Sequence, residues 1–265
     1  MNRLKLQLKI FVVLIVSSLL IPSTIEAYGW GYKKGPTNQP PEVGKYGEIL
    51  EQHGGYYLDD SGEKSVYLTF DNGYEAGYTE GILDVLTEEG VPATFFLTGH
   101  YVRSAPEIVQ RIATDGHIIG NHSYHHHDFT GLTKEKYLQE LTDLDRAVES
   151  ITGVKRLQYL RPPRGVFNEQ TIKWANEFGY IHMFWSVAFV DWHSDQKKGW
   201  ESAYQQVIDQ MHPGAIILLH TVNEDNALAL SHLIKDLKAQ GYTFKSLDDL
   251  VINDLVHDPL KAIDL

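Results

Sequence analysis

Side chains of the kinds that enzymes use for proton transfer and metal binding come at or just after short apolar segments of this sequence. They are Asp71, His122, His126, Arg161, Asp191 and His220. Carboxylates and imidazoles move protons, and histidine pairs bind divalent metals. A chance scatter of polar residues would not place them so regularly, and we therefore expect them to form one site.

His122 and His126 are four residues apart, so a helical turn would place both imidazoles on one side, as two-histidine metal sites require. The alternative is that they belong, with His125 and His127, to a hydrophilic loop. Because a carboxylate lies two predicted strands away, we predict that His122 and His126 hold a divalent metal ion, zinc or similar.

Asp71 ends an apolar strand, where a carboxylate is costly unless it is paired or functional. The planar guanidinium of Arg161 could hold Asp71 ionised through paired hydrogen bonds. A purely structural ion pair is the alternative for Arg161 and for Asp191. His220 follows a fully apolar run and should lie at the base of a pocket, unless it is a hydrogen-bonded core histidine.

The elements that must position these groups alternate between β-prone runs and amphipathic helices. The predicted strands are Ser65–Phe70, Ala93–Leu97, His117–Gly120, Tyr159–Leu160, Ile181–Phe184, Ala215–Leu219 and Tyr242–Phe244. The predicted helices are Thr79–Glu89, one opened by a capping box of Ser104 and Glu107, Lys134–Thr152, Asn168–Phe178, Trp200–Met211, Ala227–Ala239 and a short one from Ser246.

This alternation predicts the α/β class and a distorted (β/α) barrel of about seven parallel strands. An open doubly wound sheet is the alternative. In both architectures ligands bind at the carboxyl ends of the strands, where the polar groups fall.

The chain divides into three predicted parts: a signal peptide at residues 1–27, an N-terminal wrapping segment at 28–64 without helical or strand periodicity, and a catalytic domain at 65–265. We expect no transmembrane span after signal cleavage. The net charge is −12 and would become −14 in the mature chain, which argues against binding nucleic acid. The absence of cysteine excludes thiol catalysis and disulfides.

Five ordered motifs make the chain similar to the polysaccharide deacetylases of carbohydrate esterase family 4, over roughly Val66 to Leu250. The motifs are Thr69-Phe70-Asp71-Asn72-Gly73, His122-Ser123-Tyr124-His125-His126, Arg161-Pro162-Pro163-Arg164-Gly165, Asp191-Trp192, and Ile217-Leu218-Leu219-His220. More narrowly, the chain resembles the muramic δ-lactam-forming de-N-acetylases of spore-forming bacilli. That resemblance implies hydrolysis of the acetamide of N-acetylmuramic acid in spore cortex peptidoglycan.

The resemblance also implies a role for each residue. Asp71 would be the general base, and a metal held by His122 and His126 would polarise the acetamide carbonyl and water. His220 would protonate the departing amine, while Arg161 fixes Asp71 and Asp191 supports the imidazolium of His220. Substrate contacts would come from Tyr74, Arg164, Trp192 and Leu219, although Trp192, like Trp185, could instead fill the core.

Four positions depart from the family pattern. Asn72 stands where the family has a metal-binding aspartate, so metal affinity should fall or a water must intervene, and Asn72 is a doubtful third ligand. Arg164 replaces an aromatic residue, while Ala188 and Thr221 replace aspartates. We expect Arg164 to bind the lactyl carboxylate of muramic acid, unless it only pairs with a neighbouring carboxylate.

Two other functions remain open at this point. One is an N-acetylglucosamine deacetylase that acts on peptidoglycan or chitin-like oligomers, and the other is a non-catalytic wall-binding relative. A metalloprotease is disfavoured because the sequence has no His-Glu-x-x-His motif. The expected partner is the glycan strand of peptidoglycan, the expected location is the cell wall or spore cortex space, and the expected state is a monomer.

Overall fold

A parallel sheet forms the centre of the molecule in the computed structural model, which describes residues 26–257. Its seven strands lie in the order β7-β5-β4-β3-β2-β8, and β9 pairs with the beginning of β2. They are β2 (Ser65–Asn72), β3 (Ala93–Leu97), β4 (Ile118–Asn121), β5 (Tyr159–Leu160), β7 (Ile181–His182), β8 (Ala215–His220) and β9 (Thr243–Phe244). The predicted fold class is thereby confirmed, with strand bounds that differ by at most two residues at either end.

The sheet curls until its two edges meet. The short strand β7 does not pair with β8, but the chain just beyond it does, through a parallel bridge between Val187 and Ile217. The backbone N–H of Ser186 donates to Ile216 O, and that of Leu218 donates to Val187 O. The barrel is therefore closed by a seam of few hydrogen bonds, which distorts it from regular eightfold geometry.

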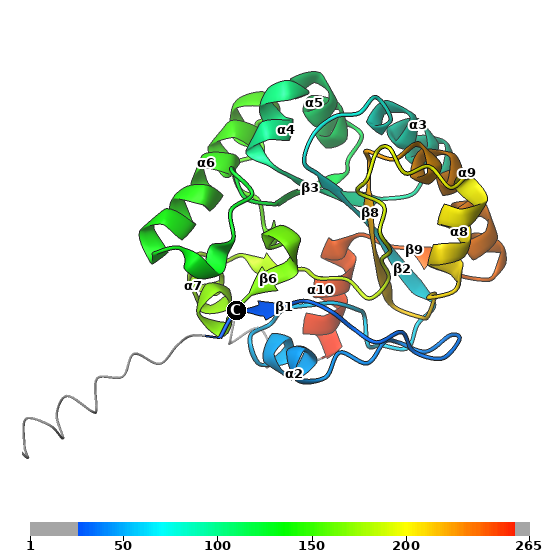
Figure 1. Ribbon diagram of the computed structural model, residues 1–265, viewed down its shortest axis with the longest axis horizontal. Helices are drawn as coiled ribbons and strands as arrows, with labels where there is room; N and C mark the ends of the chain where they lie inside the picture. The colour runs from blue at the N-terminus through cyan, green and yellow to red at the C-terminus, as the bar shows by residue number, and fades with distance from the viewer. Residues whose placement is uncertain (1–25, 258–265) are drawn as a thin grey trace, which may run out of the picture.

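Helices surround this sheet on its outer side (Figure 1). They are α3 (Thr79–Glu89), α4 (Gly99–Ser104), α5 (Pro106–Thr114), α6 (Lys134–Thr152), α7 (Glu169–Glu177), α8 (Trp200–Ile208) and α9 (Glu224–Ala239). Helix α10 (Leu247–His257) instead packs against the inner face of the sheet, where Leu247 and Leu250 join a cluster with Tyr67. Helices α3 and α6 end at Gly90 and Gly153, which adopt left-handed conformations that favour glycine. The helices bury their apolar faces against strands such as β2, of which every residue is buried.

The predicted capping box at Ser104 is wrong. Ser104 is the last residue of α4, and its hydroxyl donates to the carbonyl of Tyr101 in the preceding turn. Helix α5 begins at Pro106, because proline fits the first helical position where no N–H is needed. The side-chain cap in this region belongs to Thr98, which accepts from the N–H of Tyr101 at the start of α4.

The N-terminal segment has more regular structure than predicted. Strand β1 (Tyr28–Gly29) pairs antiparallel with β6 (Val166–Phe167), and α2 (Lys45–Gln52) follows. Trp30 is buried, lies 4.7 Å from the Phe184 ring between centroids, and donates its indole N–H to Trp185 O. The segment thus packs aromatic side chains beside the β6 region.

At the other end, the helix expected to be short runs for 11 residues as α10. None of the helices among residues 26–257 is both long enough and apolar enough to cross a membrane. The predicted signal peptide falls almost entirely on residues outside the described part of the chain.

Candidate active site

Asp71 and Arg161 form a buried ion pair at the carboxyl ends of β2 and β5. Arg161 Nη1 donates to Asp71 Oδ1 over 2.7 Å, and the guanidinium also donates to the carbonyls of Met183 and Phe184. Its side chain is wholly buried and lies over the ring of Phe96. The cost of burying this cation is therefore offset by three hydrogen-bond acceptors, one of them charged.

This pairing fixes the charge of Asp71. Burial by itself would raise the pKa of Asp71, but the charge and hydrogen bond of Arg161, together with the charges of His122 and His220, outweigh it, and the pKa lies below its usual value. Asp71 Oδ2 lies 3.6 Å from His122 Nε2. The structure thus presents an ionised carboxylate next to the predicted metal pair.

His220 is the direct neighbour of Asp71 across the sheet, because the register of β2 with β8 pairs these two residues. The imidazole Nδ1 lies 2.7 Å from Asp191 Oδ1, and the His220 backbone N–H donates to Asp191 Oδ2 over 2.8 Å. Burial lowers the pKa of His220, but the charge and hydrogen bond of Asp191 outweigh it, so the pKa is raised from the ordinary 6.5. These contacts favour the imidazolium.

Sequence reasoning missed Asn226, which supports this pair from α9. Its side-chain amide donates to Asp191 Oδ2 over 2.6 Å and to the carbonyl of His220 over 3.0 Å. Asn226 is buried in the first turns of α9. The one indication of this role in the sequence is that Asn226 is a polar residue on the apolar face of a helix that begins shortly after His220.

His122 and His126 do lie together, with ring centroids 5.0 Å apart, but no helical turn brings them there. They belong to a loop in which Ser123 and His126 have positive φ angles of 71° and 59°. The prediction of a helical turn is therefore wrong, because these left-handed residues reverse the chain direction. The carbonyl of Arg161 lies 2.8 Å from His122 Nδ1, which leaves Nε2 available as a ligand atom.

Both imidazoles are suited to metal binding, which requires the neutral ring. Burial lowers the pKa of His122, and burial together with neighbouring His122 lowers the pKa of His126 to about 4. The third candidate, Asn72, donates its side-chain amide to Thr221 Oγ1 over 2.8 Å. Its buried Oδ1 has no hydrogen-bond partner among the described residues. Asn72 and Thr221, which both depart from the family pattern, are thus hydrogen-bonded to each other. The amide oxygen of Asn72 is left without a partner within residues 26–257.

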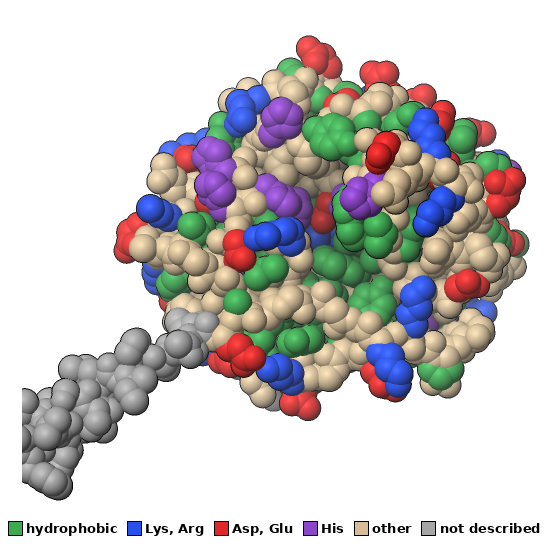
Figure 2. Space-filling view, in the orientation of Figure 1, with side chains coloured by type: hydrophobic (Ala, Val, Ile, Leu, Met, Phe, Trp, Pro, Cys, Tyr) green, Lys and Arg blue, Asp and Glu red, His purple; other side chains and the backbone are tan. Residues whose placement is uncertain are grey.

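The predicted substrate contacts lie at different depths. Tyr74 and Trp192 are exposed, and the Trp192 ring meets the His220 ring edge-on at 5.8 Å between centroids. Leu219 is buried, and Trp185 packs near the Arg161 guanidinium as part of the core. Figure 2 shows histidine side chains gathered around a hollow on this face of the molecule.

Arg164 lies at the rim on a short 3₁₀ helix, Pro163–Gly165, with a positive φ of 58°. Its side chain is 60% exposed and its Nη2 lies 3.2 Å from Asp128 Oδ2. The neighbouring carboxylate considered in the sequence analysis is thus present. An exposed pair of this kind contributes only about 0–1 kcal/mol, so the guanidinium can exchange this partner for another anion.

One group of three metal-ligating side chains within residues 26–257 has its ligand atoms within 4.8 Å of one another: His125, His127 and Glu140. This group could hold a metal ion, and the sequence analysis did not identify it. His125 and His127 were considered only as members of a loop, and Glu140 lies on the long helix α6.

Comparisons with known proteins show the family to which the chain belongs. The sequence profile described as "Polysaccharide deacetylase" matches residues 59–182. The chain is 51% identical to the peptidoglycan-N-acetylmuramic acid deacetylase PdaA of Bacillus subtilis, over 85% of this chain and 86% of that one. It is 33% identical to a peptidoglycan-N-acetylglucosamine deacetylase of Bacillus cereus, over 70% and 67%.

A solved structure gives the same result in three dimensions. The structure of B. subtilis PdaA, a family 4 carbohydrate esterase, superposes with a TM-score of 0.84 at 50% identity. The match covers 86% of this chain and 98% of that one.

Proposed function

This chain belongs to the polysaccharide deacetylase family, family 4 of the carbohydrate esterases, and from that premise we propose that it hydrolyses the acetamide of N-acetylmuramic acid in peptidoglycan. The activity class predicted from the sequence, a hydrolase that deacetylates carbohydrate, is confirmed by this membership. The observation that carries the proposed chemistry is the strand register that places Asp71 beside His220, one held ionised and the other with a raised pKa.

The two groups divide the proton transfers between them. Asp71 accepts a proton from the attacking water, since Arg161 keeps its carboxylate ionised and in place. His220 donates a proton to the departing amine nitrogen, since Asp191 favours its imidazolium form. Arg161 and Asp191 are positioning residues, and their own charges remain unchanged through the reaction. Acid and base thus occupy different electrostatic environments at the ends of two neighbouring strands, as acyl transfer at neutral pH needs.

His122 and His126 would hold a divalent metal ion, with the free amide oxygen of Asn72 as a third, uncharged ligand. The neutral imidazoles and this unpartnered buried oxygen fit such an ion. When bound, the ion supplies Lewis-acid polarisation of the acetamide carbonyl and of water. An amide in place of a carboxylate removes one negative charge from the ligand set, so we expect weak binding and a requirement for added metal.

Arg164 supports muramic acid as the substrate, because that sugar carries a lactyl group that glucosamine lacks. When the peptide stem is absent, this group ends in a carboxylate that a guanidinium can bind through two hydrogen bonds. The exposed pairing of Arg164 with Asp128 at the rim makes it available for that contact. Trp192 and Tyr74 offer exposed aromatic faces for the sugar rings.

The test is acetate release from peptidoglycan with and without its peptide stems, after chelation and metal add-back. We expect release from muramic acid residues, detected by mass spectrometry, and a lower rate for Arg164→Ala on peptide-free glycan. Lys173→Ala, on a surface cation paired with Glu169, is the matched control. Acetate that came only from N-acetylglucosamine would replace this proposal with the glucosamine deacetylase, and no release from either sugar would favour a wall-binding relative.

The proposal extends to the place of action. The basic and then apolar start of the sequence supports secretion to the cell wall or spore cortex space, where the freed amine can close a δ-lactam with the lactyl group. We propose that the enzyme acts there as a monomer. Fractionation of cells and spores with an antibody against the chain tests the location, and light scattering tests the oligomeric state.

A further inference from the structure

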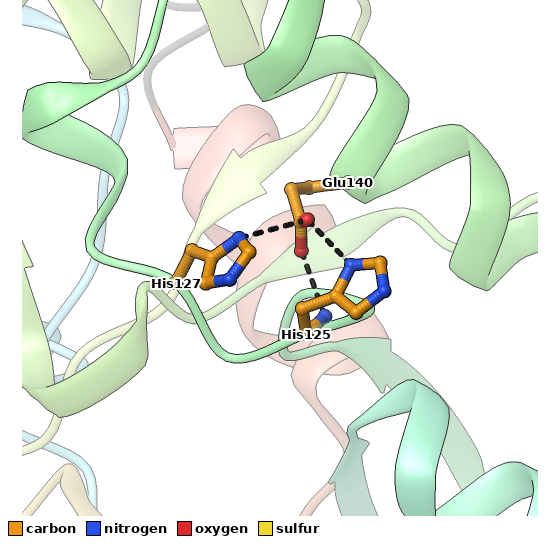
Figure 3. A group of neighbouring side chains, drawn as sticks. All are labelled: His125, His127 and Glu140. Carbon is orange, nitrogen blue, oxygen red and sulfur yellow. Dashed lines mark hydrogen bonds and ion pairs between the residues drawn. The ribbon is translucent and has the colours of Figure 1, made fainter.

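The loop that carries His122 and His126 presents two more histidines to solvent. The side chains of His125 and His127 are 55% and 57% exposed, whereas the carboxylate-bearing side chain of Glu140 between them is buried. Figure 3 shows both rings directed toward Glu140, which reaches them from α6. None of these three side chains takes part in the deacetylation described above.

The distances among them match those expected between the ligands of one metal ion. Glu140 Oε1 lies 2.8 Å from His125 Nδ1 and 3.2 Å from His127 Nδ1. Tetrahedral zinc with bonds of about 2.0–2.1 Å separates its ligand atoms by about 3.3 Å. The three ligand atoms all lie within 4.8 Å of one another. Small side-chain rotations would therefore point three ligand atoms at a common centre.

Glu140 is fixed in place for such a role. Its Oε2 accepts hydrogen bonds from Ser123 Oγ over 2.7 Å and from the His125 N–H over 2.8 Å. Although burial opposes ionisation, these donors lower the pKa of Glu140, so the carboxylate is charged. Only Oε1 faces the imidazoles, and a negative oxygen held between two rings attracts a cation.

We propose that His125, His127 and Glu140 form a second metal site, separate from the His122 and His126 pair, which takes a zinc-class divalent cation. Two imidazole nitrogens and one carboxylate oxygen suit zinc and its neighbours better than calcium or magnesium, which prefer all-oxygen sites. The exposure of both histidines leaves solvent water to complete the coordination.

This outer ion would stabilise the conformation of the loop. Ser123 and His126 hold the loop in left-handed conformations that non-glycine residues rarely adopt. The His126 N–H donates to Ser123 Oγ, which in turn donates to Glu140. An ion bound by His125, His127 and Glu140 would link the residues on either side of His126 to the same carboxylate. It would thereby hold His126 in position on the inner side of the loop.

Equilibrium dialysis of the metal-free full chain against Zn²⁺ tests the site without reference to activity. We expect His125→Gln/His127→Gln to bind one ion fewer per chain than the parent. His122→Gln/His126→Gln should retain that ion while losing deacetylation, so failure of the catalytic proposal remains distinguishable. His257→Gln, on an exposed histidine of α10, is the control and should bind as the parent does. Equal stoichiometry and affinity in the outer variant and the parent would overturn the second site.

Thermal unfolding gives an independent measurement of the effect on the loop. In the His122→Gln/His126→Gln background, added Zn²⁺ should raise the unfolding temperature, because an ion that binds only the folded chain stabilises it. Adding His125→Gln/His127→Gln to that background should abolish the rise. Circular dichroism before heating checks that each variant is folded. A zinc-induced rise that survived loss of the outer histidines would contradict the proposal.

Discussion

Two carboxylates, Asp71 and Asp191, belong to the same candidate site, and their different partners give them different effects. Asp71 pairs with a guanidinium, which does not release its proton, so the effect of the pair is an ionised and immobile carboxylate. Asp191 pairs with an imidazole, which titrates near neutrality, so its charge acts by raising the pKa of His220. The partner, more than the carboxylate, therefore determines whether a site gains a base or an acid.

Removing the base should have the largest effect on activity. Asp71→Asn keeps the shape of the side chain but cannot accept a proton, and we expect kcat to fall by about 10²–10⁴-fold. Steady-state acetate release measures this fall. Asp84→Asn, which alters a surface carboxylate also paired with an arginine, should leave the rate unchanged. A fully active Asp71→Asn enzyme would remove Asp71 from the chemistry.

Removing Arg161, the partner of Asp71, should mainly lower the stability of the folded protein. Arg161→Ala leaves a buried carboxylate without its partner, and we expect the free energy of unfolding to drop by about 3–5 kcal/mol. The exposed pair of Arg111 with Asp84 is the matched control, for which Arg111→Ala should cost about 0–1 kcal/mol. Urea unfolding followed by circular dichroism gives both values, and similar losses for the two variants would show that burial of the pair is unimportant.

The acid pair should respond to pH in a defined direction. His220 donates only when protonated, so activity is lost as the pH rises through its raised pKa. Asp191→Asn removes the negative charge that raises this pKa, so the alkaline limb of the pH–rate profile should move to lower pH. We also expect kcat at its maximum to fall by about 10²-fold. A limb that stayed in place would mean that His220 is not the titrating acid.

The smallest of these effects should come from Asn226, which hydrogen-bonds to Asp191 and to the backbone of His220. Asn226→Ala removes the amide donor to Asp191 and to the His220 carbonyl. We expect kcat to fall by about tenfold, equivalent to about 1.4 kcal/mol, with KM unchanged. Asn226→Gln, which keeps the amide group, should recover part of the rate. A change in KM alone would instead point to a role in substrate binding.

The barrel and the grouping of its polar residues could be predicted because they depend on local patterns. Runs rich in apolar residues, such as Ser65–Phe70, indicate buried parallel strands, and parallel strands bring their carboxyl ends to one edge. Asp71 and His220 end two such runs, so their proximity follows from the architecture. The position of Arg161 after a strand of only two residues followed from the same alternation.

Other features depend on contacts between distant parts of the chain and left no clear pattern in the sequence. Ser123 and His126 adopt left-handed conformations without being glycine, because surrounding hydrogen bonds hold them there. Glu140 appears in the sequence as one of several charges on an amphipathic helix, and only the fold brings it under the loop. The predicted start of the helix at Ser104 is wrong because Ser104 satisfies a local capping rule, whereas Pro106 begins α5.

The seam that closes the barrel should be one of the first parts of the domain to open. The few backbone hydrogen bonds around Ser186, Val187 and Leu218 join two edges that carry different members of the proposed site, since β8 ends at His220 and the chain beyond Val187 leads to Asp191. Segments held by few bonds open at lower free energy than the rest of a domain. Amide hydrogens along the seam should therefore exchange with solvent earlier than those in the rest of the barrel. On heating, activity should be lost while most of the secondary structure is still present.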